Sequence, residues 1–406
     1  MTKPNSLQPT IVIAGAGLVG TSFALCMKDL GVTIHILENH LPGIITQAPQ
    51  DTRPISLSFG SVRILTALGV WDELKNVACP ILSVHVSEQG RFGSTRFSAT
   101  EQNVPALGYV VPFSKLQSAL YHQTAAQSHI TISSIKSIES IHNDLTGAHI
   151  TINAGEKIVE IHADLLVAAD GTQSTCRDLL RIPHSEKNHD DVAHIYQLQL
   201  SENHNHTAYE RFTTHGVLAV LPLHDNHRVQ LVWTITPRIA KTISDWDEKQ
   251  TLAFLQTVFE GRLSITSAKQ SAQFPLKTIL AEKQIAQSAV LLGNAAHTIY
   301  PVAAQGFNLG LHDVALLSDV LIEAITNKKN IGDLATLKKY EALVENHQQK
   351  IFCITDQLTS LFELPFIGSL RGLGLLSVDL LNPLKNKLAK RTMGIADKLP
   401  RLLRRK

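Results

Sequence analysis

The sequence predicts an α/β protein in which an antiparallel β-sheet is inserted into a doubly wound domain, with a helical region at the C-terminus. Three observations support this prediction. An apolar strand at residues 11–13, a helical stretch and a second strand at 32–37 form one βαβ unit. Residues 194–234 look like an antiparallel sheet. A strand at 289–292 and a long apolar helix at 306–325 then restore the α/β pattern, so both ends of the chain belong to one domain.

The individual elements follow from local patterns. Helices are expected at 21–30, 56–68 and 114–126, the last with Ser114 as its N-cap. Residues 130–167 turn strand-like, with apolar and polar side chains alternating. The strands of the inserted sheet are expected at 194–200, 208–212, 217–223 and 228–234. His224-Asp225-Asn226-His227 is the clearest hairpin turn between them.

The composition is that of an ordinary globular chain. Hydrophobic residues make up 44% of the 406 residues and charged residues 18%, which excludes a disordered or fibrous protein. Cys26, Cys79, Cys176 and Cys353 lie far apart, which excludes a disulfide framework and a cysteine zinc cage. No apolar run reaches the roughly 20 residues of a membrane span. The polar N-terminus does not resemble a signal peptide, so we expect a cytoplasmic protein.

The net charge of +2 hides an asymmetry along the chain. Residues 371–406 contain ten Lys or Arg and only two acidic residues, Asp379 and Asp397. Residues 384–406 also space several apolar side chains as an amphipathic helix would, which favours an anionic bilayer surface. We expect no nucleic-acid partner, because the chain has no recognition motif and only 5% aromatic residues. A solvated charged face, or one packed on the body or on a partner enzyme, is the alternative.

A glycine motif follows the first strand. Gly15-x-Gly17-x-x-Gly20 opens the first helix, and Glu38 ends the next strand. The first glycine permits a tight turn, the second lets the backbone approach a pyrophosphate, and the third lets helix and strand pack closely. Glu38 would accept hydrogen bonds from an adenosine ribose. We therefore predict a Rossmann-like site that binds a dinucleotide.

Two further strands end in small or polar residues. The strand at 165–169 ends in Asp170-Gly171, and the strand at 289–292 ends in Gly293-Asn294-Ala295-Ala296-His297. Pro301 and Gln305-Gly306-Phe307-Asn308-Leu309-Gly310 follow. In a doubly wound sheet these strand ends converge at one crevice. Asp170 either shapes that crevice or caps the end of its strand.

These three landmarks, in this order and spacing, resemble those of the FAD-dependent aromatic hydroxylases of the p-hydroxybenzoate hydroxylase class. Within that class the chain is most similar to the ubiquinone-biosynthesis hydroxylases, and among them to the 2-polyprenyl-6-methoxyphenol hydroxylase branch. The segments that carry this closer resemblance are Asp51-Thr52-Arg53, Glu210-Arg211-Phe212, Gln305-Gly306-Phe307-Asn308, Asn382-Pro383-Leu384 and Arg391-Thr392-Met393-Gly394. Asn294, where the wider class has Asp, points to the same branch.

The resemblance implies a domain organisation. A discontinuous FAD-binding domain is expected at 1–80, 105–185 and 275–330. A substrate-binding β-sheet domain is expected at 81–104 and 186–274, followed by C-terminal helices with the basic tail at 331–406.

The resemblance also implies an FAD-dependent NAD(P)H:oxygen oxidoreductase. In this class NAD(P)H reduces bound FAD, O₂ then forms a flavin C4a-hydroperoxide, and its distal oxygen attacks an electron-rich phenol ring. The expected substrate is a polyprenyl phenol of ubiquinone biosynthesis, 2-polyprenyl-6-methoxyphenol. Such an enzyme would work peripherally at the inner face of the membrane, in contact with anionic lipid and with other ubiquinone-biosynthesis enzymes.

Three alternatives stay open on the sequence. The enzyme could hydroxylate another ring position of the same pathway. It could instead be a flavin-dependent reductase of a polyprenyl double bond. It could also be a scaffold subunit of a quinone-synthesis assembly.

The resemblance places a set of residues beside the flavin. Those expected to bind the cofactor are Gly15, Gly17, Gly20, Glu38, Arg53, Gln117, Asp170, Gly171, Gly293, Asn294, Gln305, Gly306, Phe307 and Asn308. Pro301 and Gly306 are expected to form the environment of flavin and substrate, and no catalytic acid or base is assigned. No metal site is expected, because His204-Asn205-His206 has no supporting carboxylate or cysteine.

Overall fold

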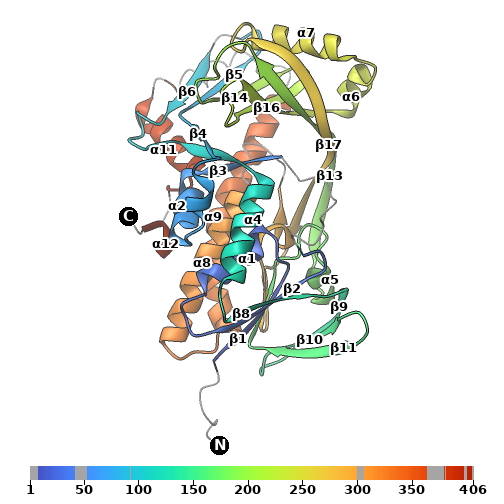
Figure 1. Cartoon of the computed structure of the whole chain (residues 1–406), viewed down its shortest axis with the longest axis vertical. Helices are drawn as coiled ribbons and strands as arrows, with labels where there is room; N and C mark the ends of the chain where they lie inside the picture. The colour runs from blue at the N-terminus through green and yellow to red at the C-terminus, as the bar shows by residue number, and fades with distance from the viewer. Residues whose placement is uncertain are drawn as a thin grey trace, which may run out of the picture.

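Two large β-sheets lie at opposite ends of the molecule's long axis, joined by two long strands (Figure 1). The computed structural model describes residues 8–41, 53–91, 93–299, 306–363, 379, 381–396 and 400–404. The lower sheet in Figure 1 has six strands, and the upper sheet has eight.

The lower sheet has the strand order β18-β19-β12-β1-β2-β8. Its strands are β1 (Thr10–Ala14), β2 (Thr33–Glu38), β8 (Ile130–Ser134), β12 (Leu165–Ala168), β18 (Ile285–Ala286) and β19 (Ala289–Leu291). All neighbouring pairs are parallel except β18 and β19. The chain runs outward from β1 on both sides, and such a switch point is where α/β sheets bind ligands.

The strands of this sheet are apolar on both faces, because helices cover one face and the segments 137–163 and 175–179 cover the other. The covering helices are α1 (Leu18–Cys26), α4 (Phe113–Ala125), α8 (Gly306–Thr326) and α9 (Leu334–Glu363). Val314, Leu317 and Leu321 of α8 recur at helical spacing and pack in one core cluster with Ile11 and Ile13 of β1. This packing holds the start of α8 beside the carboxyl end of β1.

The upper sheet has the strand order β20-β17-β13-β16-β15-β14-β5-β6. Its strands are β5 (Ser83–Glu88), β6 (Ser94–Ser98), β13 (His184–Leu200), β14 (Thr207–Thr213), β15 (Gly216–Pro222), β16 (Arg228–Ile235), β17 (Ile265–Ala281) and β20 (His297–Thr298). Neighbouring strands are antiparallel except β14 and β5, which are parallel. Helices α6 (Pro237–Ile243) and α7 (Glu248–Phe259) lie near its outer end (Figure 1).

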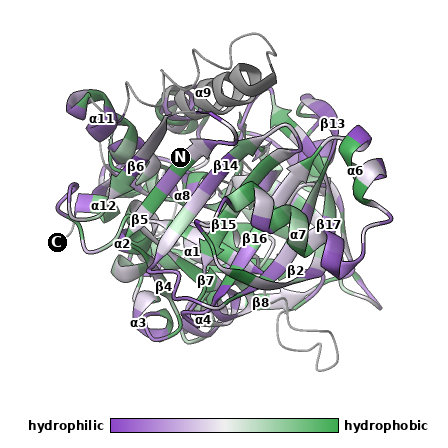
Figure 2. Cartoon of the chain, turned by 90° about the horizontal axis from the view of Figure 1, so that it is seen from above, coloured by the Kyte–Doolittle hydropathy of each residue, from purple (hydrophilic) through white to green (hydrophobic). Residues whose placement is uncertain are grey.

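Smaller elements complete the described chain. One three-stranded sheet consists of β3 (Pro54–Ser58), β7 (Gly108–Pro112) and β4 (Cys79–Ile81), and another consists of β9 (Ser137–Asn143), β10 (Ala148–Asn153) and β11 (Ile158–Ala163). The remaining helical elements are α2 (Phe59–Ala67), α3 (Trp71–Leu74), α5 (Thr175–Leu179), the 3₁₀ turn η1 (Gly293–Ala295), α11 (Asn382–Thr392) and α12 (Arg401–Arg404). Seen from above, α11 and α6 lie on opposite sides of the molecule (Figure 2). No helix in the described part of the chain is long and apolar enough to cross a membrane.

The structure confirms the α/β fold with its antiparallel sheet, and it corrects several element boundaries. The helix expected at 56–68 begins only at Phe59, because Ser56 lies in β3 and pairs with Val110 of β7. Ser58 caps this helix by accepting a hydrogen bond from the Ser61 N–H. The first helix spans Leu18–Cys26 rather than 21–30.

The N-cap expected at Ser114 is also wrong. The third helix begins at Phe113, one residue earlier, with Pro112 at its N-cap position. The expected strand at 194–200 is the second half of β13. The domain boundaries expected from the sequence stay a prediction.

Arg211 joins the upper sheet to α7. Its side chain is only 1% exposed, and its Nε and Nη1 donate to the carbonyl of Val258 and to Ser87 Oγ. Its Nη2 also lies 2.9 Å from Oε1 of Glu260. A buried guanidinium with these partners is costly to remove, because the acceptors left behind lose their hydrogen bonds.

We expect Arg211→Met to lower the free energy of unfolding by about 3 kcal/mol, measured by urea denaturation. Arg262→Met is the matched control, because Arg262 pairs with the same Glu260 at 2.7 Å but is 36% exposed. Loss of that exposed ion pair costs less than about 1 kcal/mol. Equal losses in the two variants would show that the buried contacts of Arg211 contribute nothing beyond its charge.

Candidate functional site

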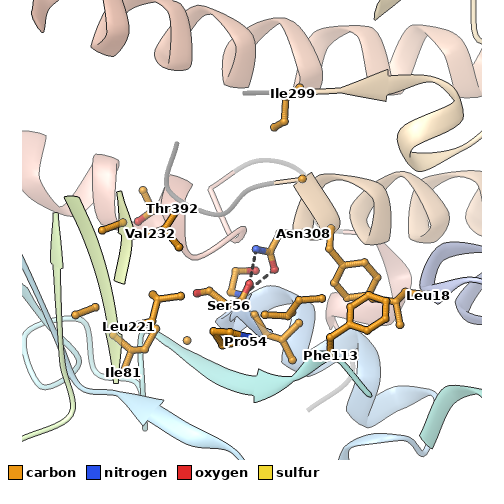
Figure 3. Close-up of a pocket in the computed structure, with 18 of the residues that line it drawn as sticks. Leu18, Pro54, Ser56, Ile81, Phe113, Leu221, Val232, Ile299, Asn308 and Thr392 are labelled. Atoms are coloured by element: carbon orange, nitrogen blue, oxygen red, sulfur yellow. Dashed lines mark hydrogen bonds between the residues drawn. The ribbon is translucent and has the colours of Figure 1, made fainter. Parts of the chain in front are cut away.

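A cavity of about 640 Å³ lies between the two large sheets. One wall consists of residues that follow strands of the lower sheet: Gly17, Ala169, Gly171, Leu292 and Asn294. The opposite wall is apolar and comes from the upper sheet: Val84, Phe97, Ala208, Ala219, Leu221 and Val232. Figure 3 shows Leu221 and Val232 on one side of the cavity, with Leu18 and Phe113 on the other. A single space therefore joins the strand ends of one sheet to the inner face of the other.

The glycine motif forms a tight backbone contact at the end of β1. Gly15 has a φ of +103°, and a Cβ added to it would lie 2.5 Å from the carbonyl oxygen of Ala169. A Cβ on Gly20 would lie 2.0 Å from the carbonyl oxygen of Gly15. Gly17, in contrast, has nothing within 4 Å of its Cβ position and lines the cavity. Two glycines thus allow close packing, while the third leaves open space at the start of α1.

Glu38 supports this loop. Its Oε2 accepts a hydrogen bond of 2.6 Å from the N–H of Ala16, and its Oε1 accepts one from the N–H of His40. The carboxylate therefore lies beside the glycine loop, where its sequence position at the end of β2 places it. Glu38 is outside the lining of the main cavity.

Asp170 holds the turn that follows β12. Its Oδ1 accepts from Ser174 Oγ at 2.5 Å, and its Oδ2 accepts from the N–H of Cys176 at 2.9 Å. Both carboxylate oxygens are used by the start of α5, as expected for a residue that caps the end of its strand. The neighbouring Gly171, with a φ of +89° and open space at its Cβ position, lines the cavity.

Gly293 and Asn294 form the turn after β19. A Cβ on Gly293 would lie 2.8 Å from Cγ2 of Val19, so this turn packs directly on α1. Asn294 is exposed, lines the cavity and donates from Nδ2 to Thr172 Oγ1 at 3.3 Å. The turns after β12 and β19 are thereby linked.

Asn308 ties the first turn of α8 to β3. Its Oδ1 accepts from the Ser58 N–H at 2.8 Å and from Ser61 Oγ at 2.7 Å, while its Nδ2 donates to the carbonyl of Ser56 (Figure 3). Gly306 and Phe307 precede it and line the cavity. Asn308 therefore positions the helix start at the cavity wall.

The remaining predicted residues are less close to the cavity. The Arg53 guanidinium lies 4.7 Å from the ring centroid of Phe274 and 5.9 Å from that of Phe113. Gln117 lies half-buried on α4 and is outside the cavity lining. Pro301 and Gln305 lie outside the described residues.

The structure also brings together residues to which sequence reasoning assigned no role. Nε2 of His297 lies 2.6 Å from Oδ2 of Asp313, which also accepts from Gln348 Nε2 at 2.9 Å. All three side chains are buried. This network fastens the 293–298 segment to α8 and α9. The sequence contained His297 at the end of its motif and Asp313 on α8, but no local pattern indicated that the two side chains meet.

Glu210 is the second such residue. It lies on β14 and lines the apolar wall of the cavity, and burial raises its pKa to about 7. The sequence signal was its place in Glu210-Arg211-Phe212, but nothing in that segment indicated which side chain faces the cavity. Within the described residues, no group of three His, Cys, Asp or Glu side chains could hold a metal ion.

The residues of the crevice fit a dinucleotide. Cβ positions at Gly17, Gly171 and Gly306 are open, so backbone at three strand or helix ends is accessible to a ligand. The helix starts at α1 and α8 favour negatively charged groups there. In this cavity the phosphates of a dinucleotide would lie on the glycine loop, and its ring system would reach the apolar wall.

Comparison with known proteins identifies the dinucleotide that this site binds. The family of FAD-binding domains matches residues 8–354 of this chain. The chain belongs to this FAD-binding domain family. FAD is therefore its cofactor, with NAD(P)H as the typical reductant of the class.

Two curated relatives of this FAD-binding protein extend over almost the whole chain. The 3-demethoxyubiquinol 3-hydroxylase of Escherichia coli (strain K12) is 28% identical, and the alignment covers 96% of this chain and 99% of the relative. The ubiquinone hydroxylase UbiL of Rhodospirillum rubrum is also 28% identical, with 97% and 92% covered. The prediction of a ubiquinone-biosynthesis FAD hydroxylase family is confirmed, and with it an FAD-dependent monooxygenase.

Solved structures show the same fold. The p-nitrophenol 4-monooxygenase PnpA of Pseudomonas putida DLL-E4 superposes with a TM-score of 0.74 at 15% identity, covering 97% of this chain and 99% of that one. The anhydrotetracycline hydroxylase OxyS of Streptomyces rimosus has a TM-score of 0.71 at 19% identity, covering 97% and 77%. The Rossmann-like fold with a second sheet is thereby confirmed.

We expect Gly17→Val to weaken FAD binding by roughly 100-fold while the protein stays folded. The valine side chain would fill the open space at the start of α1, and overpacking of this kind costs about 1–3 kcal/mol. Flavin absorbance per chain after reconstitution measures binding, and the thermal midpoint measures folding. Gly20→Ala is the contrasting variant, because its Cβ would meet backbone at 2.0 Å and should lower both. Full FAD retention in Gly17→Val would contradict the assignment of this loop to the pyrophosphate.

Proposed function

We propose that this FAD-dependent enzyme hydroxylates the ring of a polyprenyl phenol in ubiquinone biosynthesis, with 2-polyprenyl-6-methoxyphenol as its substrate. The observation that carries the proposal is the cavity, which joins the open glycine crevice to a wall made almost wholly of apolar side chains. Such a wall suits an aromatic ring and the first units of a prenyl chain. The names of the relatives support the same pathway.

A second candidate concerns the position on the ring. The Escherichia coli relative is named a 3-demethoxyubiquinol 3-hydroxylase. Its name therefore gives a quinol, rather than a methoxyphenol, as the ring that is hydroxylated. Hydroxylation of that quinol by this chain would need the same cavity and the same cofactor. The two candidates differ in the substrate that gives the higher kcat/KM.

The residues divide the work of catalysis. Bound FAD supplies the electron transfer from NAD(P)H to O₂ and the activation of oxygen. The loops at Gly17, Gly171 and Gly306 are proposed to hold the cofactor by backbone groups. Asn308 fixes the start of α8 against β3, and Phe97, Leu221 and Val232 exclude water and orient the substrate ring.

The C-terminal helix α11 closes part of the cavity. Ala389, Thr392 and Met393 line the cavity, and Ala389 and Met393 are buried. Lys385 anchors the helix through ion pairs with Glu101 at 3.1 Å and Asp379 at 3.2 Å. α11 is thus a wall of the proposed substrate site as well as part of the basic tail.

The other side of α11 supports the proposed membrane contact. Leu381 and Leu384 are 55% and 46% exposed, and Lys387, Lys390 and Arg391 are exposed as well. Exposed leucines beside a group of cations suit an anionic bilayer surface. A prenyl chain leaving the cavity beside α11 would then pass directly into lipid.

Product mass tests the proposed reaction. Reconstituted protein is incubated with FAD, NADH or NADPH, isotopically labelled O₂ and a short-chain 2-prenyl-6-methoxyphenol. We expect a product that is heavier by one labelled oxygen atom. A product that gains two hydrogens would show a reductase, and consumption of reductant with unchanged phenol would overturn the hydroxylase proposal for this substrate. Short-chain demethoxyubiquinol in a parallel reaction compares the two candidates.

We expect Lys387→Glu/Lys390→Glu to weaken sedimentation with anionic liposomes at low salt by roughly thirtyfold. Each cation near an anionic surface contributes about 1 kcal/mol, so the loss of the two cations alone gives this factor, and the two new carboxylates add repulsion. Charge reversal is preferable to truncation, which would also remove Ala389, Thr392 and Met393 from the cavity wall. The control is Lys241→Glu/Lys249→Glu, exposed lysines of α6 and α7 on the far side from α11 (Figures 1 and 2). Equal binding by both double variants and wild type would leave partner docking or solvation as the role of α11.

A further inference from the structure

Glu210 provides the only carboxyl group among the described residues that line the cavity. It belongs to the wall formed by the upper sheet, opposite the strand ends of the lower sheet. Its cross-strand neighbours are Ala219 on β15 and Val86 on β5, and neither can donate a hydrogen bond from its side chain. A carboxyl group in this position needs an explanation, because an apolar side chain would fill the wall at no electrostatic cost.

The alternation of β14 explains why Glu210 is unpaired. Successive side chains of a strand point to opposite faces, so Ala208 and Glu210 face the cavity. Tyr209 also borders the cavity, but its side chain packs on the α7 side with Phe259 and donates to the carbonyl of Arg262, and Arg211 pairs there with Glu260. The adjacent arginine therefore cannot neutralise Glu210.

No other charged group among the described residues neutralises Glu210. On β5, Glu88 lies on the same face, opposite Phe212, and is itself acidic. On α11, Lys385 is engaged with Glu101 and Asp379. Near β3, Arg53 lies over the ring of Phe274. Within the described part of the chain no hydrogen bond or ion pair reaches the Glu210 carboxyl group.

We propose that the Glu210 carboxylate accepts the proton of the ring hydroxyl of the bound substrate. The phenolic O–H bond breaks, a carboxyl O–H bond forms, and the electron pair stays on the ring oxygen. Because a phenol has a pKa of about 10, this transfer is completed only as the ring is attacked, and the electron density left on the ring oxygen promotes attack by an electrophilic oxygen. This assignment rests on the proposed function, because it requires a phenolic substrate in the cavity.

The environment of Glu210 suits this task near neutral pH. Burial raises the pKa of Glu210 to about 7, which makes its carboxylate a stronger base than an exposed one. The base must be deprotonated, so the hydroxylation rate rises as pH increases through about 7. In the absence of that carboxylate this rise disappears.

The test compares Glu210→Gln with Glu88→Gln. The first variant keeps the shape of the side chain and removes the base. The second removes a carboxylate from the same sheet face at a residue outside the cavity lining. Bound FAD and thermal midpoint confirm folding. The probe is short-chain 2-prenyl-6-methoxyphenol, and the rate of its hydroxylation is followed from pH 5 to 9 together with the rate of flavin reduction.

We expect the hydroxylation rate of the wild type and of Glu88→Gln to rise as pH passes through about 7, and that of Glu210→Gln to show no such rise. We expect the hydroxylation rate of Glu210→Gln at pH 8 to fall by about 100-fold or more, the usual effect of losing a general base. Oxidation of NAD(P)H that yields hydrogen peroxide instead of product should rise in that variant.

A stability measurement checks the titration independently. The pKa of Glu210 is raised from 4.5 to about 7 in the folded protein, so stability falls as pH rises from about 4.5 to about 7 and stays lower above that. Glu210→Gln should therefore have a higher thermal midpoint than wild type at pH 9 and a similar one at pH 5.

Two outcomes separate this assignment from the proposed function. Equal hydroxylation rates and equal pH profiles in wild type and Glu210→Gln would overturn the role of Glu210. If wild type oxidises NAD(P)H without adding oxygen to the probe, the proposed hydroxylation is wrong, and a higher thermal midpoint of Glu210→Gln at pH 9 but not at pH 5 would still show an unpaired carboxyl group in the cavity wall.

Discussion

The site depends on one constraint, the close approach of backbone to backbone at the end of β1. Gly15 lies against the carbonyl of Ala169, and Gly20 lies against the carbonyl of Gly15, with no room for a Cβ at either position. Glu38 holds the N–H of Ala16 in the same loop. These contacts bring the ends of β1, β2 and β12 together, and they leave Gly17 as the accessible point. Any side chain that separated these backbones would displace three walls of the crevice together.

The opposite wall is organised by the hydrophobic effect rather than by backbone contacts. Side chains of the upper sheet alternate, so one face packs against α7 and the other faces the cavity. Arg211 and Glu210 are neighbours in sequence, yet one is satisfied by Glu260 and the other lies among apolar residues. An unpaired carboxyl group in an apolar wall lowers stability when it is charged, so a chemical role is the better account of its presence.

Several elements could be predicted from the sequence because their causes are local. The βαβ unit, the hairpin turn at residues 224–227 and helix α8 follow from glycine spacing, turn chemistry and apolar periodicity. The start of α2 could not be predicted, because Ser56 lies in a strand that pairs with Val110. A contact between residues so far apart in the chain leaves no local sequence pattern. Asp170 shows the same limit, since its partners Ser174 and Cys176 became evident only with the turn in place.

By itself the sequence determined the α/β class, the dinucleotide crevice and the family, because each follows from short motifs in which residue type and spacing carry the chemistry. The tertiary structure alone decided that α11 forms a wall of the cavity, that Asn308 is used to fasten α8 to β3, and that Glu210 rather than Arg211 lines the cavity. The reason is physical: which face of a strand or helix is covered depends on elements far away in the chain, and burial, with its effect on charge, exists only after they have packed.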